Sequence, residues 1–281
     1  MGFLYLKIIV SFFIFAFFIR LFFAYNSRNL NLKGYDIVGT PGNNYILKCK
    51  VQTSNLLGFD KYGEMVDFYI DDNFIGMSST DKNGIAEIGH YFDEPGTHVI
   101  TIKLSEKSRY FANPSNIVAG IYNEHKPILI CDIDHTVCDT KILLFLLNQD
   151  IKIPAVKNSS EVLNRVAEKY DIIYVTHRDN AFIHKTKFWL DLFNYPAGPI
   201  FFWNFGKYTF NNEKYKQRII KNLKKQFPNI SVGIGDKTGD AIAYIKNGLK
   251  SILITDEKHH GLPEDVIQTK NWNKIEHLLL N

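Results

Sequence analysis

Two carboxylates follow a run of apolar residues in the middle of the chain. Asp132 and Asp134, separated by Ile133, come directly after the run 128–131, which Pro127 precedes. Such a run predicts a strand buried on both faces of a parallel sheet. Because sites in open α/β sheets lie beyond the carboxyl ends of the strands, both carboxylates should reach one crevice, with Ile133 pointing away. Two acids this close repel, which favours a Mg²⁺ ion between them and one carboxylate acting as nucleophile, although a solvated loop after a strand has the same pattern.

Two later predicted strands also end in polar residues. One ends at Thr176 and Arg178, and another is followed by Asp236 and Asp240. A basic helix between these strands carries Lys216 near its start. Polar residues at three strand ends therefore indicate a functional site more strongly than the first pair of acids alone.

The pattern around these residues alternates between strand and helix. This alternation predicts a parallel sheet with helices on both faces, in a domain of residues 127–281. After the first strand we expect strands at 171–176, 199–202, 230–235 and 251–255, and helices at 159–169, 181–193, 213–227 and 238–247.

Residues 36–112 show a different pattern, with apolar residues at every second position and turn residues between the runs. The expected strands are 45–51, 66–70, 74–77, 85–88 and 98–104. They predict a small all-β sandwich between a polar linker at 26–33 and a connection at 113–126. The stretches 68–76, 80–86 and 95–100 resemble bacterial Ig-like modules, which implies a spacer or a module that binds a partner not identified by the sequence.

The first 25 residues are almost wholly apolar. An uncharged run from Ile8 to Ile19 is flanked by Lys7 and Arg20, and with these charges at its ends the segment predicts a single-pass membrane anchor. A cleaved signal peptide is the alternative. More basic residues follow the segment than precede it, which favours a cytoplasmic location of the later domains by a small margin, so the side of the membrane stays open.

Charge and cysteine content exclude some classes of protein. The formal net charge is +4, but four basic residues and no acid lie in the first 35 residues, and the rest of the chain balances at 29 basic against 29 acidic residues. This balance argues against bulk binding of nucleic acid, so no nucleic-acid partner is expected. Three cysteines do not indicate a disulfide scaffold.

Taken together, the polar segments resemble the haloacid dehalogenase (HAD) superfamily of Mg²⁺-dependent phosphatases. Its motifs are DxDx[TV], a strand-terminal Ser or Thr, a Lys, and Gly-Asp with a further acid. They occur here in that order, at Asp132 to Thr136, at Thr176, at Lys216, and at Asp236 with Asp240. The resemblance covers residues 127–281 and implies a Rossmann-like fold. His135 departs from the pattern, because many members have Gly there, and it changes the turn while leaving the acids in place.

The resemblance implies a role for each catalytic residue. Asp132 would attack phosphorus and form an aspartyl-phosphate, and Asp134 would protonate the leaving oxygen and later deprotonate water. Thr176 would hydrogen-bond a phosphoryl oxygen, and Lys216 would offset negative charge, with Lys214 as the alternative for that role. The implied cofactor is Mg²⁺.

The same resemblance implies the metal ligands. They would be the Asp132 carboxylate, the backbone carbonyl of Asp134, and Asp236. Asp240 would either bind the metal directly or contact one of its ligands. A dianionic phosphate can approach so many acids only if the metal and the lysine offset their charge.

A narrower resemblance concerns the substrate. The segments Asp132-Ile-Asp-His-Thr, Thr176-x-Arg178, Pro196-Ala-Gly-Pro199-Ile, Tyr215-Lys216 and Asp240-x-x-x-Tyr244 are similar to the catalytic domain of lipin-type and related phosphatidate phosphatases. Those enzymes release phosphate from phosphatidate and leave diacylglycerol. Arg178 is then a candidate substrate contact, and an ion pair with Asp179 or Asp240 is its alternative.

The intervals between the motifs leave little room for a large cap domain, so we expect an open site suited to a substrate on a surface. Residues 178–225 are basic and rich in aromatic side chains, a composition that suits the headgroup region of an anionic phospholipid membrane. The alternative is that these aromatic residues belong to the core and the basic residues to a solvated helix face.

Other functions use the same motifs. A phosphatase acting on a phosphoprotein, a nucleotide or a sugar phosphate would need the same acids and the same lysine. The alternative that is not an enzyme is a non-catalytic binding module, in which the β-rich region recognises a partner.

Overall fold

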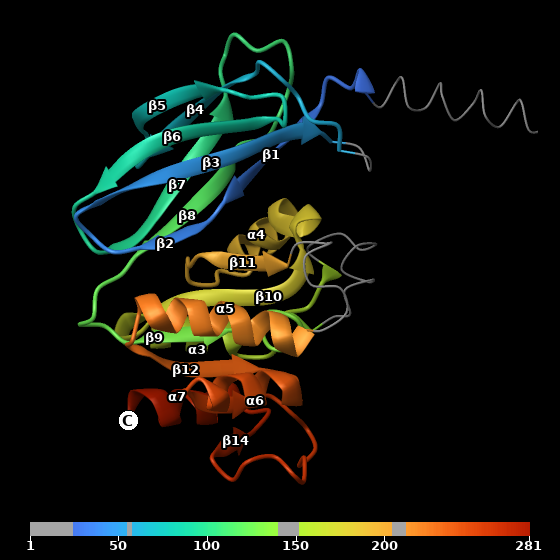
Figure 1. Cartoon of the computed structure of the whole chain (residues 1–281). Helices are drawn as coiled ribbons and strands as arrows, with labels where there is room; N and C mark the ends of the chain where they lie inside the picture. The colour runs from blue at the N-terminus through green and yellow to red at the C-terminus, as the bar shows by residue number, and fades with distance from the viewer. Residues whose placement is uncertain (1–24, 55–57, 140–151, 204–211) are drawn as a thin grey trace, which may run out of the picture. The chain divides into compact units, whose positions relative to one another are not determined.

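A computed structural model describes residues 25–54, 58–139, 152–203 and 212–281 (Figure 1). The chain divides into two compact units. The first comprises residues 1–35, 46–90 and 100–117, and the second comprises residues 36–45, 91–99 and 118–281. The two units therefore interleave along the sequence. The domain ranges predicted above, 1–25, 36–112 and 127–281, stay predictions.

The first eight strands of the described chain form two sheets. A three-stranded sheet has the order β1 (Leu30–Tyr35), β3 (Asn43–Thr53), β6 (Ile85–Phe92). A five-stranded sheet has the order β2 (Ile37–Gly39), β8 (Ser115–Ile121), β7 (Gly96–Leu104), β4 (Met65–Ile70), β5 (Asn73–Ser79). Strand β4 is antiparallel to β5 and β7, whereas β2 pairs with β8 in parallel.

Alternation of side chains explains why these segments are strands. In β3, Leu47, Cys49 and Val51 are fully buried while the residues between them are not, and in β1 Leu30 and Leu32 are buried in the same way. A period of two places one set of side chains on the face that packs inside. Each such strand therefore contributes one apolar face to its core.

The second unit contains a six-stranded sheet in which every pair is parallel. Its order is β11 (Ile200–Trp203), β10 (Asp171–Asp179), β9 (Ile128–Cys131), β12 (Ile230–Gly235), β13 (Lys250–Leu253), β14 (Val266–Gln268). Strand β9 lies between β10 and β12, so the carboxyl ends of these three strands are neighbours (Figure 1).

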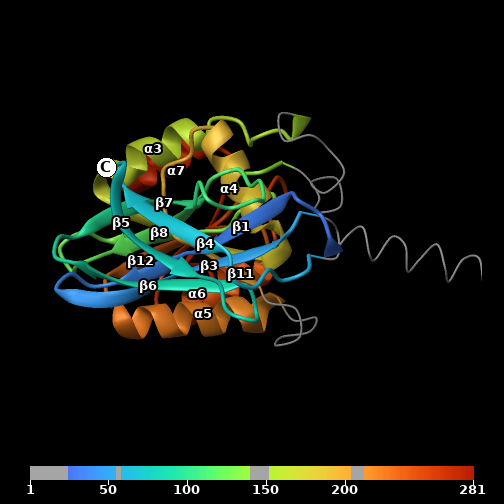
Figure 2. The same ribbon diagram turned by 90° about the horizontal axis from the view of Figure 1, so that it is seen from above.

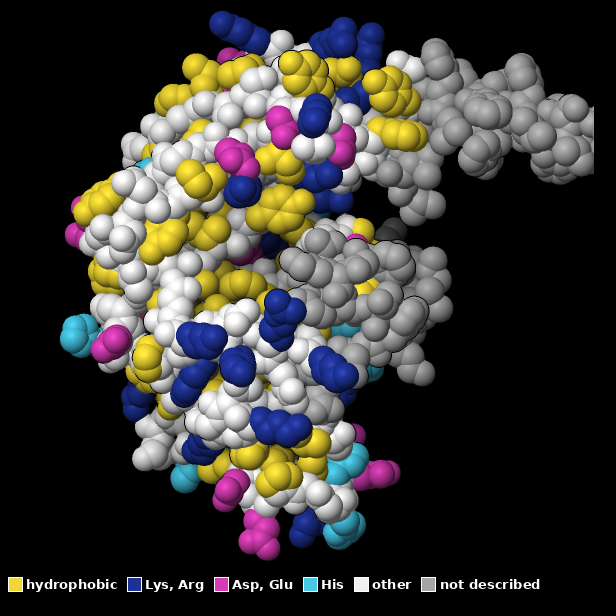
Figure 3. All heavy atoms as spheres, in the orientation of Figure 1, with side chains coloured by type: hydrophobic (Ala, Val, Ile, Leu, Met, Phe, Trp, Pro, Cys, Tyr) yellow, Lys and Arg dark blue, Asp and Glu magenta, His cyan; other side chains and the backbone are white. Residues whose placement is uncertain are grey.

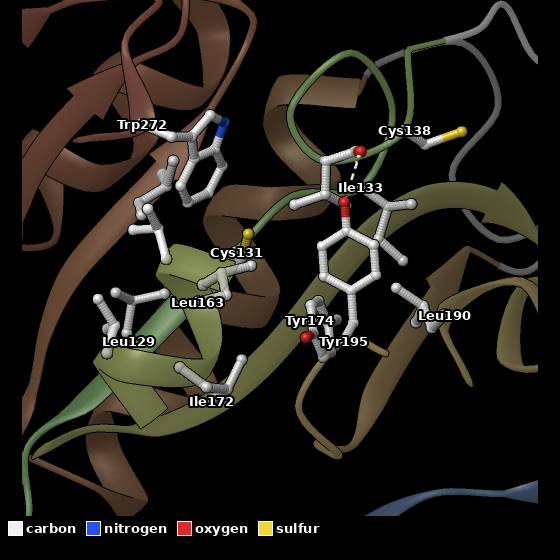
Figure 4. Packing of buried hydrophobic residues seen from close by; sticks show 14 of the residues in the cluster. Leu129, Cys131, Ile133, Cys138, Leu163, Ile172, Tyr174, Leu190, Tyr195 and Trp272 are labelled. Atoms are coloured by element: carbon white, nitrogen blue, oxygen red, sulfur yellow. Dashed lines mark hydrogen bonds between the residues drawn. The ribbon is translucent and has the colours of Figure 1, made fainter. Parts of the chain in front are cut away.

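Helices cover both faces of this parallel sheet. Figure 2 shows α3 (Ser159–Lys169) and α7 (Trp272–Leu280) on one side and α5 (Asn212–Gln226) with α6 (Thr238–Lys246) on the other. The short helix η2 (Asn180–Phe182) and α4 (Ile183–Leu192) follow β10. Leu129, Cys131 and Ile133 pack with α3, α4 and α7 in one buried cluster (Figure 4), and Ile128 and Ile130 pack with α5 and α6 in another.

Most of the predicted strands and helices are confirmed, with ends shifted by a few residues. Five elements differ from the prediction, and one of them, β2, lies at Ile37–Gly39, where no strand was expected. Strand β1 includes part of the predicted linker 26–33, and β8 lies inside the predicted connection 113–126. Strand β14 and helix α7 were not predicted. The Leu-x-Leu alternation in β1 is a local sign of a strand. A short strand is nevertheless stabilised by its partners in the sheet, and the local sequence does not reveal which segments those partners are.

The predicted fold class, an N-terminal membrane helix followed by a small Ig-like sandwich and a Rossmann-like domain without a large cap, is wrong as a whole. The described chain consists mostly of strands in three sheets, with few helices. Stretches 36–45 and 91–99 group with the C-terminal unit rather than with the β-rich region around them in sequence. A local pattern predicts strands, but the distribution of strands among sheets depends on contacts between distant segments.

The predicted membrane localisation is also corrected. Within the described ranges, no helix combines the length and the apolar character needed to cross a membrane. This finding contradicts the single-pass anchor predicted at residues 1–25, of which residues 1–24 lie outside the described residues. The uncharged run 8–19 is by itself shorter than the about 20 residues that a bilayer requires.

Candidate functional site

The site lies where β9, β10 and β12 end next to one another. Asp132 directly follows β9, Thr176 lies near the end of β10, and Asp236 directly follows β12. Parallel pairing of these strands aligns their carboxyl ends, so residues far apart in sequence become neighbours. Arg178 and Asp134, for example, are 44 positions apart and are in contact. The order of strands in the sheet therefore assembles the predicted motifs.

A tight turn brings Asp134 back over the end of β9. Backbone amides of Thr136, Val137 and Cys138 all point to the Ile133 carbonyl, and the His135 amide donates to the Cys138 carbonyl at 2.8 Å. His135 has a φ of 55°, in the left-handed region that favours glycine. This explains why many members of the superfamily that the motif resembles have Gly there. Ile133 is fully buried, as predicted.

Lys216 joins two of the acids. Its Nζ lies 2.8 Å from Asp132 Oδ1 and 2.9 Å from Asp240 Oδ1, and all three side chains are at most 2% exposed. Asp240 lies in the first turn of α6, and Gly235 lets it approach, because a Cβ at Gly235 would meet the Asp240 carboxylate at 2.8 Å. The cluster is therefore held by close packing as well as by charge.

The helix α5 distinguishes Lys216 from Lys214. Lys216 shares a buried stripe with Ile220, Leu223 and Phe227, spaced four, seven and eleven residues on. Lys214 is exposed. It belongs to the stripe 214, 218, 221 and 225, and Lys and Arg side chains gather over α5 in Figure 3. The geometry thus places Lys216 in the site, and its spacing from Ile220, Leu223 and Phe227 is a signal that would have distinguished it from Lys214.

Burial sets the electrostatics of this cluster. It raises the pKa of Asp132 well above its usual value, an effect that Lys216 opposes and Asp240 increases. Burial also raises the pKa of Asp236, against the attraction of Lys237. For Lys216 burial alone would lower the pKa, but Asp132 and Asp240 outweigh it and the pKa is raised. The site therefore carries more negative charge than the lysine offsets.

The acids fit a divalent cation. Asp132, Asp236 and Asp240 each offer one oxygen within 4.8 Å of the others. Asp236 Oδ1 is buried and accepts no hydrogen bond within the described part of the chain. Carboxylate oxygens are the ligands that Mg²⁺ prefers. Of the four acids predicted as ligands, the Asp134 side chain is not in this group, and the predicted use of its backbone carbonyl stays a prediction.

Arg178 occupies a different place from the one predicted. Its side chain is fully buried, and its Nη2 and Nε bind Asp134 Oδ1 at 2.9 and 3.1 Å. Thr176 Oγ1 donates to Asp134 Oδ2 at 3.3 Å. The sequence reasoning offered a substrate contact or an ion pair with Asp179 or Asp240, and the pair with Asp134 was not among these. Arg178 and Thr176 together therefore hold the second acid of the first motif.

Aromatic residues near the site belong largely to the core. Trp189 and Tyr195 are buried, and Trp203 stacks on His177 with ring centroids 4.9 Å apart. Burial lowers the pKa of His177, and Lys237 and Lys216 add to this. Phe188 is exposed. His177 and Trp203 were not singled out by sequence, because an aromatic pair has no spacing that reveals it.

The predicted absence of a large cap falls partly outside the described residues. The segments in question include 140–151 and 204–211, which are not described. The described stretches next to them, 152–158 and Ile200–Trp203, are short.

Residues 129–254 match the family model "PITM 1-3, LNS2 domain". The LNS2 domain is lipin-like, and the match supports the predicted relationship to phosphatidate phosphatases at this coarse level and relates this part of the chain to phosphatases of phospholipids. The matched range contains the acids of the site, Thr176, Arg178 and Lys216. None of the curated proteins matches the chain.

Solved structures give only weak likenesses. A chain of the Pnkp1/Rnl/Hen1 RNA repair complex is 15% identical with a TM-score of 0.38, over 45% of this chain and 42% of that one. A putative membrane anchored protein from Corynebacterium diphtheriae is 14% identical with a TM-score of 0.28, over 35% of this chain and 22% of that one. The CARDB domain of PF1109 from Pyrococcus furiosus is 15% identical with a TM-score of 0.25, over 34% of this chain and 86% of that one. The chain thus spans less than half of the first two structures.

Proposed function

We propose that the protein hydrolyses a phosphate monoester with Mg²⁺ through an aspartyl-phosphate, and that the substrate is a membrane phospholipid such as phosphatidate. The observation that carries the proposal is the buried triad in which Lys216 joins Asp132 to Asp240 at distances of 2.8 and 2.9 Å. A buried carboxylate beside a lysine and a metal-binding set of acids suits nucleophilic attack on a phosphoryl group.

In the first step, a carboxylate oxygen of Asp132 forms a bond to phosphorus as the bond from phosphorus to the ester oxygen breaks. The leaving oxygen takes its proton from the Asp134 carboxyl group, so Asp134 enters the second step as a carboxylate. In the second step, a water oxygen attacks phosphorus, Asp134 takes a proton from that water, and the bond from phosphorus to Asp132 breaks. Inorganic phosphate leaves and the Asp132 carboxylate is restored.

The other residues stabilise charge. Lys216 would offset the charge of the phosphoryl oxygens and of Asp132. The Thr176 hydroxyl, near the end of β10, donates its one hydrogen to Asp134 Oδ2 and would turn it to a phosphoryl oxygen when phosphate binds. Bound Mg²⁺, held by Asp132, Asp236, Asp240 and the Asp134 carbonyl, would neutralise negative charge on the phosphate. These groups would allow a phosphate dianion to bind in a site that is rich in carboxylates.

The LNS2 match supports the lipid substrate. A phospholipid surface is therefore the proposed partner. The basic face of α5, seen in Figure 3, has the sign of charge that attracts anionic lipid.

The test measures phosphate released by the full chain from phosphatidate in detergent micelles and from glycerol 3-phosphate, each with Mg²⁺ or with a chelator. Asp132→Asn should lose at least about a thousandfold in kcat, because it removes the nucleophile. Asp256→Asn is the matched control, since Asp256 is 75% exposed in a pair with Lys270.

Each outcome decides one part of the proposal. Mg²⁺-dependent release that favours phosphatidate and disappears in Asp132→Asn supports it fully. Release from glycerol 3-phosphate alone would keep the mechanism and reject the lipid substrate. Equal activity of Asp132→Asn and wild type, or no release from any monoester, would reject the enzyme.

A further inference from the structure

The Asp134 carboxylate is surrounded by hydrogen-bond donors. Oδ1 accepts from Arg178 Nη2 at 2.9 Å and from Nε at 3.1 Å. Oδ2 accepts from Arg178 Nε at 3.2 Å and from Thr176 Oγ1 at 3.3 Å. The carboxylate is 17% exposed, so it keeps one open side. Asp134 is therefore fixed in orientation yet still reachable by a small molecule such as water.

Arg178 is itself held in place. Its side chain has no exposed surface, and its Nη1 donates to Thr186 Oγ1 at 3.1 Å. Thr186 is fully buried in α4, and the Arg178 backbone amide donates to Thr176 Oγ1 at 3.2 Å. A planar guanidinium bound on both edges loses its rotational freedom, so it fixes the plane of the carboxylate that it binds.

We propose that Arg178, held by Thr186, is a positioning residue that keeps Asp134 ready as the base for hydrolysis of the aspartyl-phosphate. This inference rests on the proposed function. In that step a water oxygen bonds to phosphorus, a water proton moves to Asp134, and the bond from phosphorus to Asp132 breaks. Arg178 touches none of these atoms and acts through Asp134.

The donor pattern favours the second step over the first. All four contacts reach Asp134 from donors, and a carboxylate that only accepts satisfies every one of them. A carboxylic acid in the same place would turn an O–H toward a donor. The role of Arg178 should therefore appear in breakdown of the phosphoenzyme more than in its formation.

The experiment uses the ³²P-labelled monoester that the wild-type chain hydrolyses, either phosphatidate in micelles or glycerol 3-phosphate. Steady-state kinetics are measured together with the acid-stable label on the protein. Arg178→Met should lower kcat by about 10- to 100-fold, within the range of a misplaced base. KM should fall with it, so kcat/KM changes by less than about threefold and the labelled fraction of the protein rises.

Two further variants keep the test valid if Arg178→Met folds poorly. Arg178→Lys should recover part of the loss in kcat, because an ammonium cannot bind both carboxylate oxygens as a fork does. Thr186→Val, which is nearly isosteric, should change kcat and the labelled fraction in the same direction by about two- to fivefold. Melting temperatures of all variants are recorded alongside.

The matched control is Arg165→Met. Arg165 also binds a carboxylate with two nitrogens, pairing with Glu276 between α3 and α7 on an exposed surface. It should leave kcat, KM and the labelled fraction unchanged.

Three results would overturn the inference. A raised KM with unchanged kcat in Arg178→Met would make Arg178 a substrate contact. Equal losses in kcat and kcat/KM without extra label would place its effect in the first step. Losses that follow only the melting temperature would make the pair structural. A wild-type chain that hydrolyses no monoester would instead reject the proposed function itself.

Discussion

At the scale of single residues, the main feature of the site is the balance between its carboxylates and its cations. With Asp132, Asp134, Asp236 and Asp240 ionised, the carboxylates outnumber the Lys216 and Arg178 cations that pair with them, and a bound Mg²⁺ ion would offset the excess. Burial makes this excess costly, as the raised pKa of Asp132 shows. Cation binding and phosphate binding should therefore depend on the same few side chains.

Lys216 and Lys214 provide a direct test of this balance. Lys216→Met should lower kcat/KM by about 10²- to 10³-fold and should lower the melting temperature in the absence of Mg²⁺, because Asp132 and Asp240 lose their buried partner. Lys214→Met, two positions away and exposed, should leave both quantities unchanged. Equal effects of the two substitutions on phosphate release would contradict the assignment of Lys216 to the site.

At the scale of elements, the turn from β12 into α6 positions two of the acids. Asp236 ends the strand and Asp240 lies in the first turn of the helix, where its carboxylate also accepts from the Lys237 amide at 3.4 Å. An acid in this position is favoured by the helix dipole. Helix α5 completes the arrangement, since its buried stripe carries Lys216 toward the ends of the strands.

The close approach at Gly235 can be tested by adding one methyl group. Gly235→Ala would place a Cβ at 2.8 Å from the Asp240 carboxylate, so α6 must shift. We expect the Mg²⁺ concentration for half-maximal activity to rise by about tenfold, by analogy with the loss caused when groups that orient metal ligands are changed. Gly248→Ala is the control, because an added Cβ there meets open space, although its φ of 71° adds some local strain. An unchanged Mg²⁺ requirement in Gly235→Ala would show that Asp240 does not depend on this packing.

At the scale of the whole molecule, the second unit is assembled from distant segments of the chain. Asp36, which lies between β1 and β2, is buried in this unit. Its carboxylate accepts from the Val118 amide at 2.8 Å and the Ile200 amide at 3.0 Å, and it pairs with Lys187 of α4. Burial raises the pKa of Asp36, and Lys187 opposes that rise. One side chain thus links three segments that are far apart in sequence.

Removing this link should destabilise the protein. Asp36→Ala removes the carboxylate that pairs with Lys187 and accepts from two backbone amides, and losing one partner of a buried ion pair costs about 3–5 kcal/mol. Urea denaturation of the full chain, followed by tryptophan fluorescence, measures the loss. Asp256→Ala, in an exposed pair, should leave the unfolding midpoint nearly unchanged. A similar small effect in both variants would mean that Asp36 does not hold the segments together.

The sequence by itself determined the elements that carry the site. Period-two alternation marked β3 to β7, and apolar runs marked the parallel strands other than β14. The positions of Asp132, Asp134, Asp236 and Thr176 near strand ends followed from the spacing of these runs. Lys214 remained an alternative to Lys216 in the sequence. The structure separates them, because two positions turn a helix by about 200° and only Lys216 lies in the buried stripe.

Only the tertiary structure decided which distant groups meet. Arg178 binds Asp134 rather than the substrate, Asp36 binds Lys187, and β1 and β8 are strands because they find partners. The membrane anchor was predicted from local composition and is contradicted, whereas the predicted succession of domains stays a prediction. Local patterns report how a side chain lies on its own element, whereas partners far along the chain are chosen by packing, burial and charge in the folded molecule.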